Sequence, residues 1–434
     1  MARRMRDWRG LTVSNAAPAT LAAMDDFAIG YLGYHPRMLG VIAAADADPG
    51  CSLAQAQAAI LHMLAETRSA PDAARPYLDA AERAAGGTTE RERTVVAAVR
   101  AWADDDVDRS LALLDAIWTE HPRDIVAAKL AQTHRFNRGE AEGMLRGGLA
   151  AQAANDDLAH AHSMAAFGHE QCNDMRAAEQ AASAALAIDP DEPWGHHAIA
   201  HILLTEGRNA EARAFLTKAA PSWDGRLSFI RTHNHWHLTL VRIEQGDGAA
   251  VLDAFDRHVW NDQPSLPQDQ VGAVSLLVRL ELVGVDVGDR WTAMAPWLRD
   301  RIDDHVQPFL SMQYLYGMAR TGEQSTADDM LDAIRATAAH SGWRAWAEIC
   351  VPASEGLLAH ARGEYATAAD ALAAVLPRME KTGGSHAQRD LFEQIFTDAL
   401  IRAGRTDEAA TRLRARLVGN PDSLPTQIAL SRLG

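Results

Sequence analysis

The sequence predicts an all-α fold, a right-handed α-solenoid built from helix–turn–helix units. The first observation is that pairs of apolar, Ala-rich helical segments recur with a period of 34 residues. The second is that no convincing run of alternating β-branched residues lies between hairpin turns, so strands are expected to be nearly absent. Almost half of the 434 residues are apolar, which suits a chain that buries a long helical core.

Small residues mark where the helices of each pair approach one another. Ala166 and Ala178 lie on two successive helical segments, and Pro190 ends the second of them. Thirty-four residues later, Ala200 and Ala212 occupy the same places. A helix–turn–helix period of this length, with Ala at the crossing and Pro at the end, is typical of tetratricopeptide repeats.

The repeats differ in clarity along the chain. They are clearest at residues 101–122, 159–220 and 355–421, whereas residues 220–350 fit the pattern loosely. Nothing between them resembles a flexible linker, because no Gly- or Ser-rich stretch separates the repeats. We therefore expect a single tetratricopeptide-like superhelical domain over residues 1–434.

Composition limits the classes of partner and location. The 42 basic and 58 acidic residues give a net charge of −16, which disfavours nucleic acid and anionic membranes as partners. The three cysteines form no CxxC pair, and no apolar stretch is long enough to span a bilayer. The basic start leads into no apolar segment, so a cytoplasmic location is expected. Exposed solenoid ends often pair, which leaves a homodimer open.

Two histidine pairs are the first candidate site. His197 and His201 are four residues apart, and so are His233 and His237. Spacing of four puts both rings of a pair on one helix face. Both pairs fall on first helices of successive repeats, which line the concave face of a solenoid, so all four rings are expected to face one cavity. His235 falls off that face.

The chemistry of these pairs has two interpretations. Imidazole is the commonest metal ligand, so two pairs could supply three or four nitrogens to a divalent transition metal. The first pair lacks the Glu of a metallopeptidase HExxH motif, so a hydrolytic base would have to come from Glu170 or Asp390. The alternative is structural, with the rings hydrogen-bonded between packed helices. His196 is expected to pack against a neighbouring helix.

Five segments resemble one known family, the bacterial and animal relatives of tetratricopeptide repeat protein 38. They occur in order along nearly the whole chain: SMAAFGHEQ (163–171), HAIAHILLTEGR (197–208), HNHWHLTLVRIEQGD (233–247), LLVRLELVGVDVGDRW (276–291) and GGSHAQRD (383–390). The resemblance implies a repeat fold and no particular activity.

The resemblance also selects individual residues. Matched position by position, it selects His197, His201, His233, Asn234, Trp236, His237, Ser385, His386, Gln388, Arg389 and Asp390. Asn234 and Trp236 would then contribute to ligand binding. Ser311 and Gln313 stand where the family has an acid and a histidine. If that acid and that histidine take part in the family's chemistry, this protein has lost the activity or altered its specificity.

The segment GGSHAQRD has a structural and a functional interpretation. Ser385 followed three residues later by Gln388 predicts a capping box at a helix start. In the functional interpretation, Arg389 binds a carboxylate, and Asp390 orients His386 as an acid–base pair, since the two are four residues apart.

These observations leave two functions. In the first, a histidine-lined cavity binds a small molecule and acts on it, as a hydrolase or lyase for a small acid or amide. The four histidines then either coordinate a metal or exchange protons with the ligand as catalytic residues. In the second, the chain is a non-enzymatic scaffold that holds a peptide or protein partner in its groove. The histidine-lined faces, which lack the Lys and Asn that usually recruit peptide carboxylates, favour the first.

Overall fold

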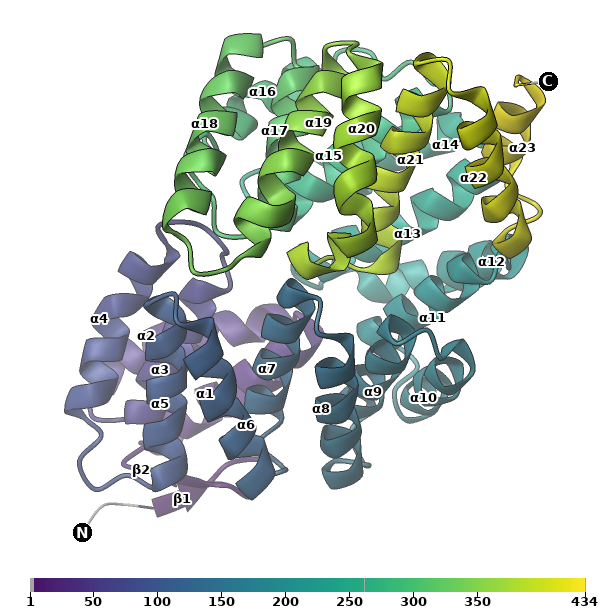
Figure 1. Cartoon of the computed structure of the whole chain (residues 1–434). Helices are drawn as coiled ribbons and strands as arrows, with labels where there is room; N and C mark the ends of the chain where they lie inside the picture. Colours follow the sequence, from purple (N-terminus) through teal and green to yellow (C-terminus); the bar gives the residue numbers. More distant parts are fainter. Residues whose placement is uncertain (1–3, 261, 434) are drawn as a thin grey trace. The chain divides into compact units, whose positions relative to one another are not determined.

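The computed structural model describes residues 4–260 and 262–433, and these residues form an all-α fold with one short β-hairpin (Figure 1). The first twelve helices are α1 (Pro18–Gly33), α2 (Gly40–Ala47), α3 (Ser52–Met63), α4 (Ala70–Arg83), α5 (Glu90–Ala103), α6 (Val107–Glu120), α7 (Ile125–Arg138), α8 (Ala141–Ala154), α9 (Ala159–Gln171), α10 (Met175–Ile188), α11 (Pro193–Thr205) and α12 (Asn209–Ala219). The remaining helices are α13 (Ile230–Glu244), α14 (Gly248–Ala254), α15 (Pro267–Leu282), α16 (Arg290–Arg299), α17 (Pro308–Arg320), α18 (Gln324–His340), α19 (Val351–Ala361), α20 (Tyr365–Val375), α21 (His386–Arg402), α22 (Thr406–Gly419) and α23 (Leu424–Ser431).

The 34-residue period is visible in where the helices begin. The second helices of four successive pairs begin at Val107, Ala141, Met175 and Asn209, at positions 34 residues apart. The small residues lie at the crossings as expected: Ala166, Ala178, Ala200 and Ala212 are fully buried. The prediction of an all-α solenoid of tetratricopeptide-like helix pairs is confirmed.

The period loosens in the second half of the chain. Helix α13 begins 37 residues after α11, at Ile230 rather than at a 34-residue step from Pro193. Short irregular helical segments interrupt the regular pairs: η1 (Pro36–Leu39), η2 (Ala220–Trp223), η3 (Phe255–Val259), η4 (Trp346–Cys350) and η5 (Leu376–Thr382). Of these, η2 lies between α12 and α13 and adds to the spacing there. Three of these segments lie between residues 220 and 350, the region where the sequence pattern is weakest.

The β-hairpin is the small exception within an expectation that is confirmed, since strands are nearly absent from the described residues. Strand β1 (Arg4–Arg6) pairs antiparallel with β2 (Thr12–Ser14), and Met5 lies opposite Val13. Gly10 in the connecting turn has φ of +82°, a left-handed conformation that favours glycine. A three-residue strand is too short for its alternation to stand out from the sequence.

The described residues form two compact units, and the division falls inside α11, after Ala198. The first unit contains the chain up to Arg135, with residues 141–198 and 223–230; the second contains residues 136–140, 199–222 and the chain from Arg231 onward. The single domain expected over residues 1–434 stays a prediction. None of the helices in the described ranges combines the length and apolar character that crossing a bilayer requires.

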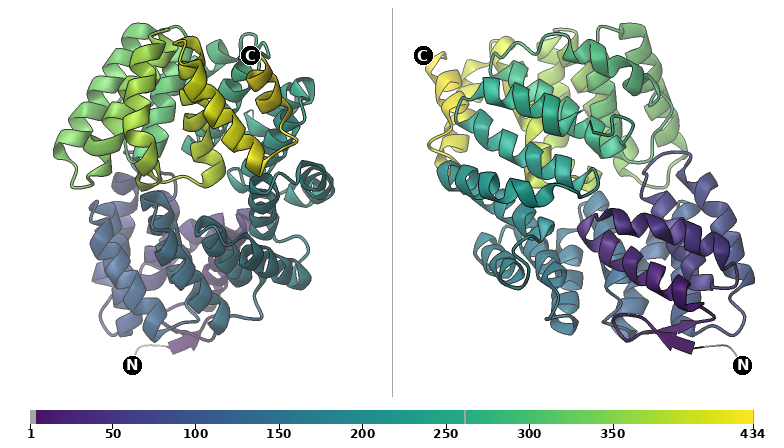
Figure 2. Two further views of the ribbon diagram at one scale, coloured as in Figure 1. Left: turned by 45° about the vertical axis from the view of Figure 1, so that its right-hand side comes forward. Right: turned by 180° about the vertical axis from the view of Figure 1, so that it is seen from behind.

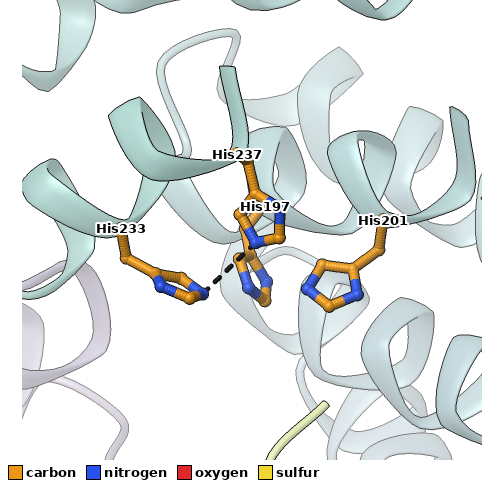
Figure 3. Close-up of side chains that lie close together, drawn as sticks. All are labelled: His197, His201, His233 and His237. Atoms are coloured by element: carbon orange, nitrogen blue, oxygen red, sulfur yellow. Dashed lines mark hydrogen bonds between the residues drawn. The ribbon is translucent and has the colours of Figure 1, made fainter. Parts of the chain in front are cut away.

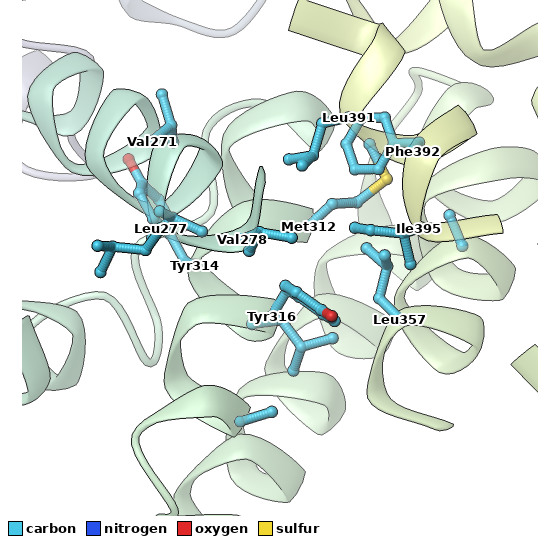
Figure 4. Close-up of a cluster of buried hydrophobic side chains, with 14 of the residues drawn as sticks. Val271, Leu277, Val278, Met312, Tyr314, Tyr316, Leu357, Leu391, Phe392 and Ile395 are labelled. Carbon is cyan, nitrogen blue, oxygen red and sulfur yellow. The ribbon is translucent and has the colours of Figure 1, made fainter. Parts of the chain in front are cut away.

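Each unit has its own apolar core. In the first, side chains such as Phe27, Tyr31 and Leu78 are almost wholly buried. In the second, α15, α17, α19 and α21 converge, so that Met312, Leu357 and Phe392 share one interior (Figure 4). The helices from α19 to α22 lie side by side in chain order, as the views in Figure 2 show.

Candidate metal centre

The start of α11 is fixed by residues with well-defined local roles. Pro193 lies in its first turn, where a helix has no use for the amide hydrogen that proline lacks. The carboxylate of Glu192 accepts a hydrogen bond from the Gly195 amide at 2.5 Å, which satisfies one of the free amides of the helix start. These contacts set the register in which the following residues face their neighbours.

Four imidazoles that the spacing singled out come together on α11 and α13 (Figure 3). We name this group the histidine cluster, and its members are His197, His201, His233 and His237. Each offers one ring nitrogen, and these four atoms all lie within 4.8 Å of one another. The four residues are between 0% and 8% exposed, so the cluster is buried.

The members of the cluster are in close mutual contact. Nε2 of His237 lies 3.2 Å from Nε2 of His233, and the ring centroids of His201 and His237 are 4.5 Å apart. Because α11 is one continuous helix, His197 precedes His201 by about one helical turn.

The environment favours neutral rings. Burial, together with the nearby His201, lowers the pKa of His233 to about 3. His233 is therefore neutral near pH 7, because a histidine is charged only below its pKa. A neutral imidazole keeps the nitrogen lone pair that binds a metal ion.

Two further residues selected by the family resemblance lie on the same helix. Asn234 is fully buried and Trp236 is 2% exposed. The ring of Trp236 stacks on His233, with centroids 5.2 Å apart and planes 10° apart. Trp236 therefore forms a wall of the histidine cluster, and its role in binding a ligand stays a prediction.

The neighbouring histidines lie outside the cluster, as the helix register predicts for both. The ring of His196 contacts the carbonyl oxygen of Pro190 at 2.9 Å and accepts a hydrogen bond from Nε1 of Trp223 at 3.2 Å. His235 stacks on His258, with ring centroids 4.1 Å apart. Both rings are engaged in packing.

The capping box predicted at the start of α21 is confirmed. The Ser385 hydroxyl accepts a hydrogen bond from the Gln388 amide at 3.3 Å. The Gln388 side chain accepts one in return from the Ser385 amide at 2.9 Å. Each side chain thus satisfies a backbone amide that the helix itself leaves free.

The three candidate residues that follow have other partners than those expected. Asp390 accepts hydrogen bonds from the Arg416 guanidinium and, at 2.6 Å, from Nε2 of Gln394. Arg389 donates to Nδ1 of His386 at 3.2 Å and also to the carbonyl oxygen of Gly384. Asp390 would have to exchange its partners to orient His386, so the acid–base pair stays a prediction.

Arg279 is a buried residue that contacts both α13 and α21, and the sequence pattern did not point to it. It lies on α15, is 1% exposed, and its guanidinium carbon is 5.4 Å from the ring centroid of Trp236. Nη2 of the same side chain donates to the carbonyl oxygen of Ala387 at 2.8 Å. Arg279 therefore joins the segment around the second histidine pair to the start of α21. An arginine inside the apolar run LLVRLEL was the available signal.

The acidic candidate and the two family departures are also buried. Glu170, on α9 of the first unit, is fully buried and accepts a hydrogen bond from Gln171 at 2.5 Å. Oγ of Ser311 lies 3.0 Å from Nδ1 of His305. Gln313 donates to the carbonyl oxygen of Phe309 at 3.3 Å. In these positions Ser311 and Gln313 act as packing residues of α17.

Fold and site together define a helical-repeat protein with a buried four-histidine cluster. No family model matches the chain. A solved structure of the APC/C hetero-tetramer Cut9–Hcn1 matches at 14% identity and a TM-score of 0.41, covering 84% of this chain and 63% of that one. This chain thus covers less than two thirds of the length of the matched chain in that structure.

Two further solved structures match with lower scores. The structure of Naa15/Naa10 bound to HypK-THB matches at 10% identity and a TM-score of 0.24, covering 91% of this chain and 68% of that one. The P58(IPK) TPR domain matches at 14% identity and a TM-score of 0.23, covering 80% of this chain and 97% of that one.

Proposed function

We propose that this chain is a helical-repeat scaffold that binds a divalent transition metal through its histidine cluster. The observation that carries the proposal is the convergence of four buried imidazole nitrogens within 4.8 Å of one another. Packing alone does not require four such rings on two helices to aim nitrogens at a common point. A metal ion at that point would bind all four nitrogens together, in place of the hydrogen bond that joins His233 to His237.

The spacing of the nitrogens suits a tetrahedral ion. Zinc binds histidine nitrogens at about 2.0–2.1 Å, so ligand atoms on adjacent corners of the tetrahedron lie about 3.3 Å apart. The 3.2 Å between the Nε2 atoms of His233 and His237 already matches this edge. The other rings need only small side-chain rotations, since their nitrogens lie within 4.8 Å.

A bound ion would link α11 to α13 through side chains. If all four rings bind, the site is closed and the ion is structural; if three bind, the fourth position stays open to a small ligand. Imidazole-only ligand sets suit zinc, copper, iron and nickel, and zinc fits the tetrahedral spacing best.

The scaffold is favoured over the enzyme. A hydrolase or lyase acting on a small acid or amide needs a positioned base, and both predicted bases are engaged: Asp390 by Arg416 and Gln394, and Glu170 by Gln171. A peptide or protein partner suits the repeat fold, and a net charge of −16 favours a basic one. We also propose that the chain is related to tetratricopeptide repeat protein 38, whose motifs it resembles. A cytoplasmic location and a homodimer are compatible with a scaffold of this kind.

Metal analysis of the purified chain tests the proposal. After equilibration with zinc and removal of free ion, elemental analysis is expected to find a single ion per chain. Replacing two ligands on different helices, as His201→Ala and His237→Ala, is expected to remove it, because the remaining rings cannot complete a tetrahedral site.

The matched control is His235→Ala, which removes an imidazole from α13 outside the histidine cluster. This variant is expected to keep its ion, and circular dichroism checks that each variant is folded. Zinc that stays bound in the double variant, or that is absent from the folded parent chain, would show that the cluster is a packing feature.

A further inference from the structure

The chain is almost free of lysine. Of its 42 basic residues only Lys129, Lys218 and Lys381 are lysines. Lys218 and Lys381 are exposed, whereas Lys129, on α7 of the first unit, is 8% exposed. Arginine stays charged in proteins, whereas a buried lysine can lose its proton and become a nucleophile. Lysine at the buried position therefore provides chemistry that arginine could not.

The amine of Lys129 lies on an aromatic face. Its Nζ atom is 3.9 Å from the ring centroid of Trp194, which lies in the first turn of α11. The nearby carboxylate of Glu192 is engaged by other groups: it accepts hydrogen bonds from the Ser163 hydroxyl and the Gly195 amide, and contacts Nδ1 of His160 at 3.2 Å. Glu192 thus acts on the amine through its charge.

The surroundings of Lys129 lower the pKa of its amine. Burial lowers the pKa of Lys129 to about 8, although the charge of Glu192 opposes the shift. An ordinary lysine has a pKa of about 10.4 and is almost entirely protonated near pH 7. Lys129 therefore has a much larger fraction of neutral, nucleophilic amine than an ordinary lysine has.

Trp194, whose ring the amine contacts, forms an aromatic wall with two further rings. The ring of Trp194 lies 5.8 Å from that of Tyr34 and 6.1 Å from that of Phe229, and Tyr34 and Phe229 are 5.4 Å apart. All three residues are partly buried. Such a wall suits the apolar or aromatic body of a small molecule.

The backbone is strained where it supports this wall. Tyr34 has φ of 51° and Phe229 has φ of 75°, in the left-handed region that bulky residues rarely adopt. The Leu227 amide donates to the Tyr34 carbonyl oxygen at 2.6 Å, which ties the two segments together. Strained residues of this kind concentrate at binding and catalytic sites, because the surrounding structure must hold them in place.

We propose that Lys129 binds an aldehyde or ketone with an aromatic or apolar body as an imine. Nζ attacks the carbonyl carbon and forms a carbon–nitrogen bond, which gives a carbinolamine. The carbonyl oxygen then leaves as water with the two hydrogens of the neutral amine, and the imine remains. The body of the ligand packs on Trp194 and Phe229.

Reductive labelling of the whole chain tests the proposal, and the exposed lysines are its internal controls. The folded protein is treated with benzaldehyde and cyanoborohydride near pH 7, and adducts are located by peptide mass spectrometry. Lys129 is expected to be labelled about tenfold faster than Lys218 or Lys381, because more of its amine is neutral. The ratio of Lys129 labelling to labelling of the two exposed lysines is expected to fall as the pH is raised above about 8, where the amine of Lys129 is already largely neutral.

A second variant and a second reagent test the wall. Phe229→Gly removes a ring while relieving the left-handed strain, so the fold should persist. It is expected to lower benzaldehyde labelling of Lys129 several-fold and to leave labelling by formaldehyde, which has no apolar body, nearly unchanged. Equal labelling of the three lysines, or no label on Lys129 in the folded chain, would overturn the proposal. Equal effects of the variant on both aldehydes would overturn the ligand class.

Discussion

At the residue scale, helical spacing predicts side-chain contacts well when both partners lie on one helix. The pairs on α11 and α13 face one another as the four-residue spacing indicates. The same spacing links His386 to Asp390, yet Asp390 bonds to Arg416, 26 residues later in the chain. A charge-assisted bond to a guanidinium outcompetes a contact with the His386 ring, and the fold decides which arginine lies within reach of Asp390.

Arg279 gives a prediction at this scale. Arg279→Lys keeps the positive charge but cannot both cover Trp236 and donate to the Ala387 carbonyl oxygen with the same geometry. We expect the free energy of unfolding to fall by about 1–3 kcal/mol, the cost of a lost buried hydrogen bond to a charged group. Urea denaturation monitored by circular dichroism measures the change.

The control for this change is Arg335→Lys on α18, where the arginine side chain is 48% exposed. It should alter the free energy of unfolding by no more than about 0.5 kcal/mol, since surface substitutions rarely exceed that value. Similar effects of the two substitutions would mean that Arg279 is not a structural link between α13 and α21.

At the element scale, the sequence predicts most where the repeat is regular. The 34-residue period places α6, α8, α10 and α12 correctly because each pair must bury the same Ala-rich crossing against its neighbours. The hairpin at the start of the chain and the irregular segments η2, η3 and η4 escape prediction. They belong to no repeat, and short apolar runs do not reveal their conformation.

Two adjacent glycines on α8 test how tightly these helices pack. A Cβ added at Gly148 would lie 2.7 Å from the carbonyl oxygen of Met164 on α9, and backbone cannot rotate away. Gly148→Ala is therefore expected to cost about 1–3 kcal/mol by overpacking. A Cβ at Gly147 would meet nothing within 4 Å, so Gly147→Ala should stabilise by about 0.5–1 kcal/mol through helix propensity.

Thermal and urea unfolding of both variants measure these opposite changes in the free energy of unfolding. The two changes share one chemistry and one helix, so differences in propensity cancel between them. If both variants gained stability, the close approach of α8 and α9 would be absent in solution.

At the scale of the whole molecule, the sequence indicates the fold class and the surface charge. It cannot indicate where the chain divides into compact units, because that division falls inside the continuous helix α11, after Ala198. No change in composition and no helix-breaking residue marks this boundary between the two units. The histidine cluster lies on this same helix and on α13, so a metal ion bound there is linked to the stability of the folded chain.

Linkage turns the metal site into a prediction about the whole chain. An ion that binds only the folded state adds RT ln(1 + [L]/Kd), about 2.7 kcal/mol at a free concentration one hundred times Kd. Zinc is therefore expected to raise the midpoint of thermal unfolding by a few degrees, and a chelator to reverse the rise. Scanning calorimetry across a zinc titration measures it. The His201→Ala, His237→Ala double variant should unfold at one temperature whatever the zinc concentration, and His235→Ala should respond like the parent chain. A zinc-dependent rise of equal size in the double variant would place the ion elsewhere on the chain.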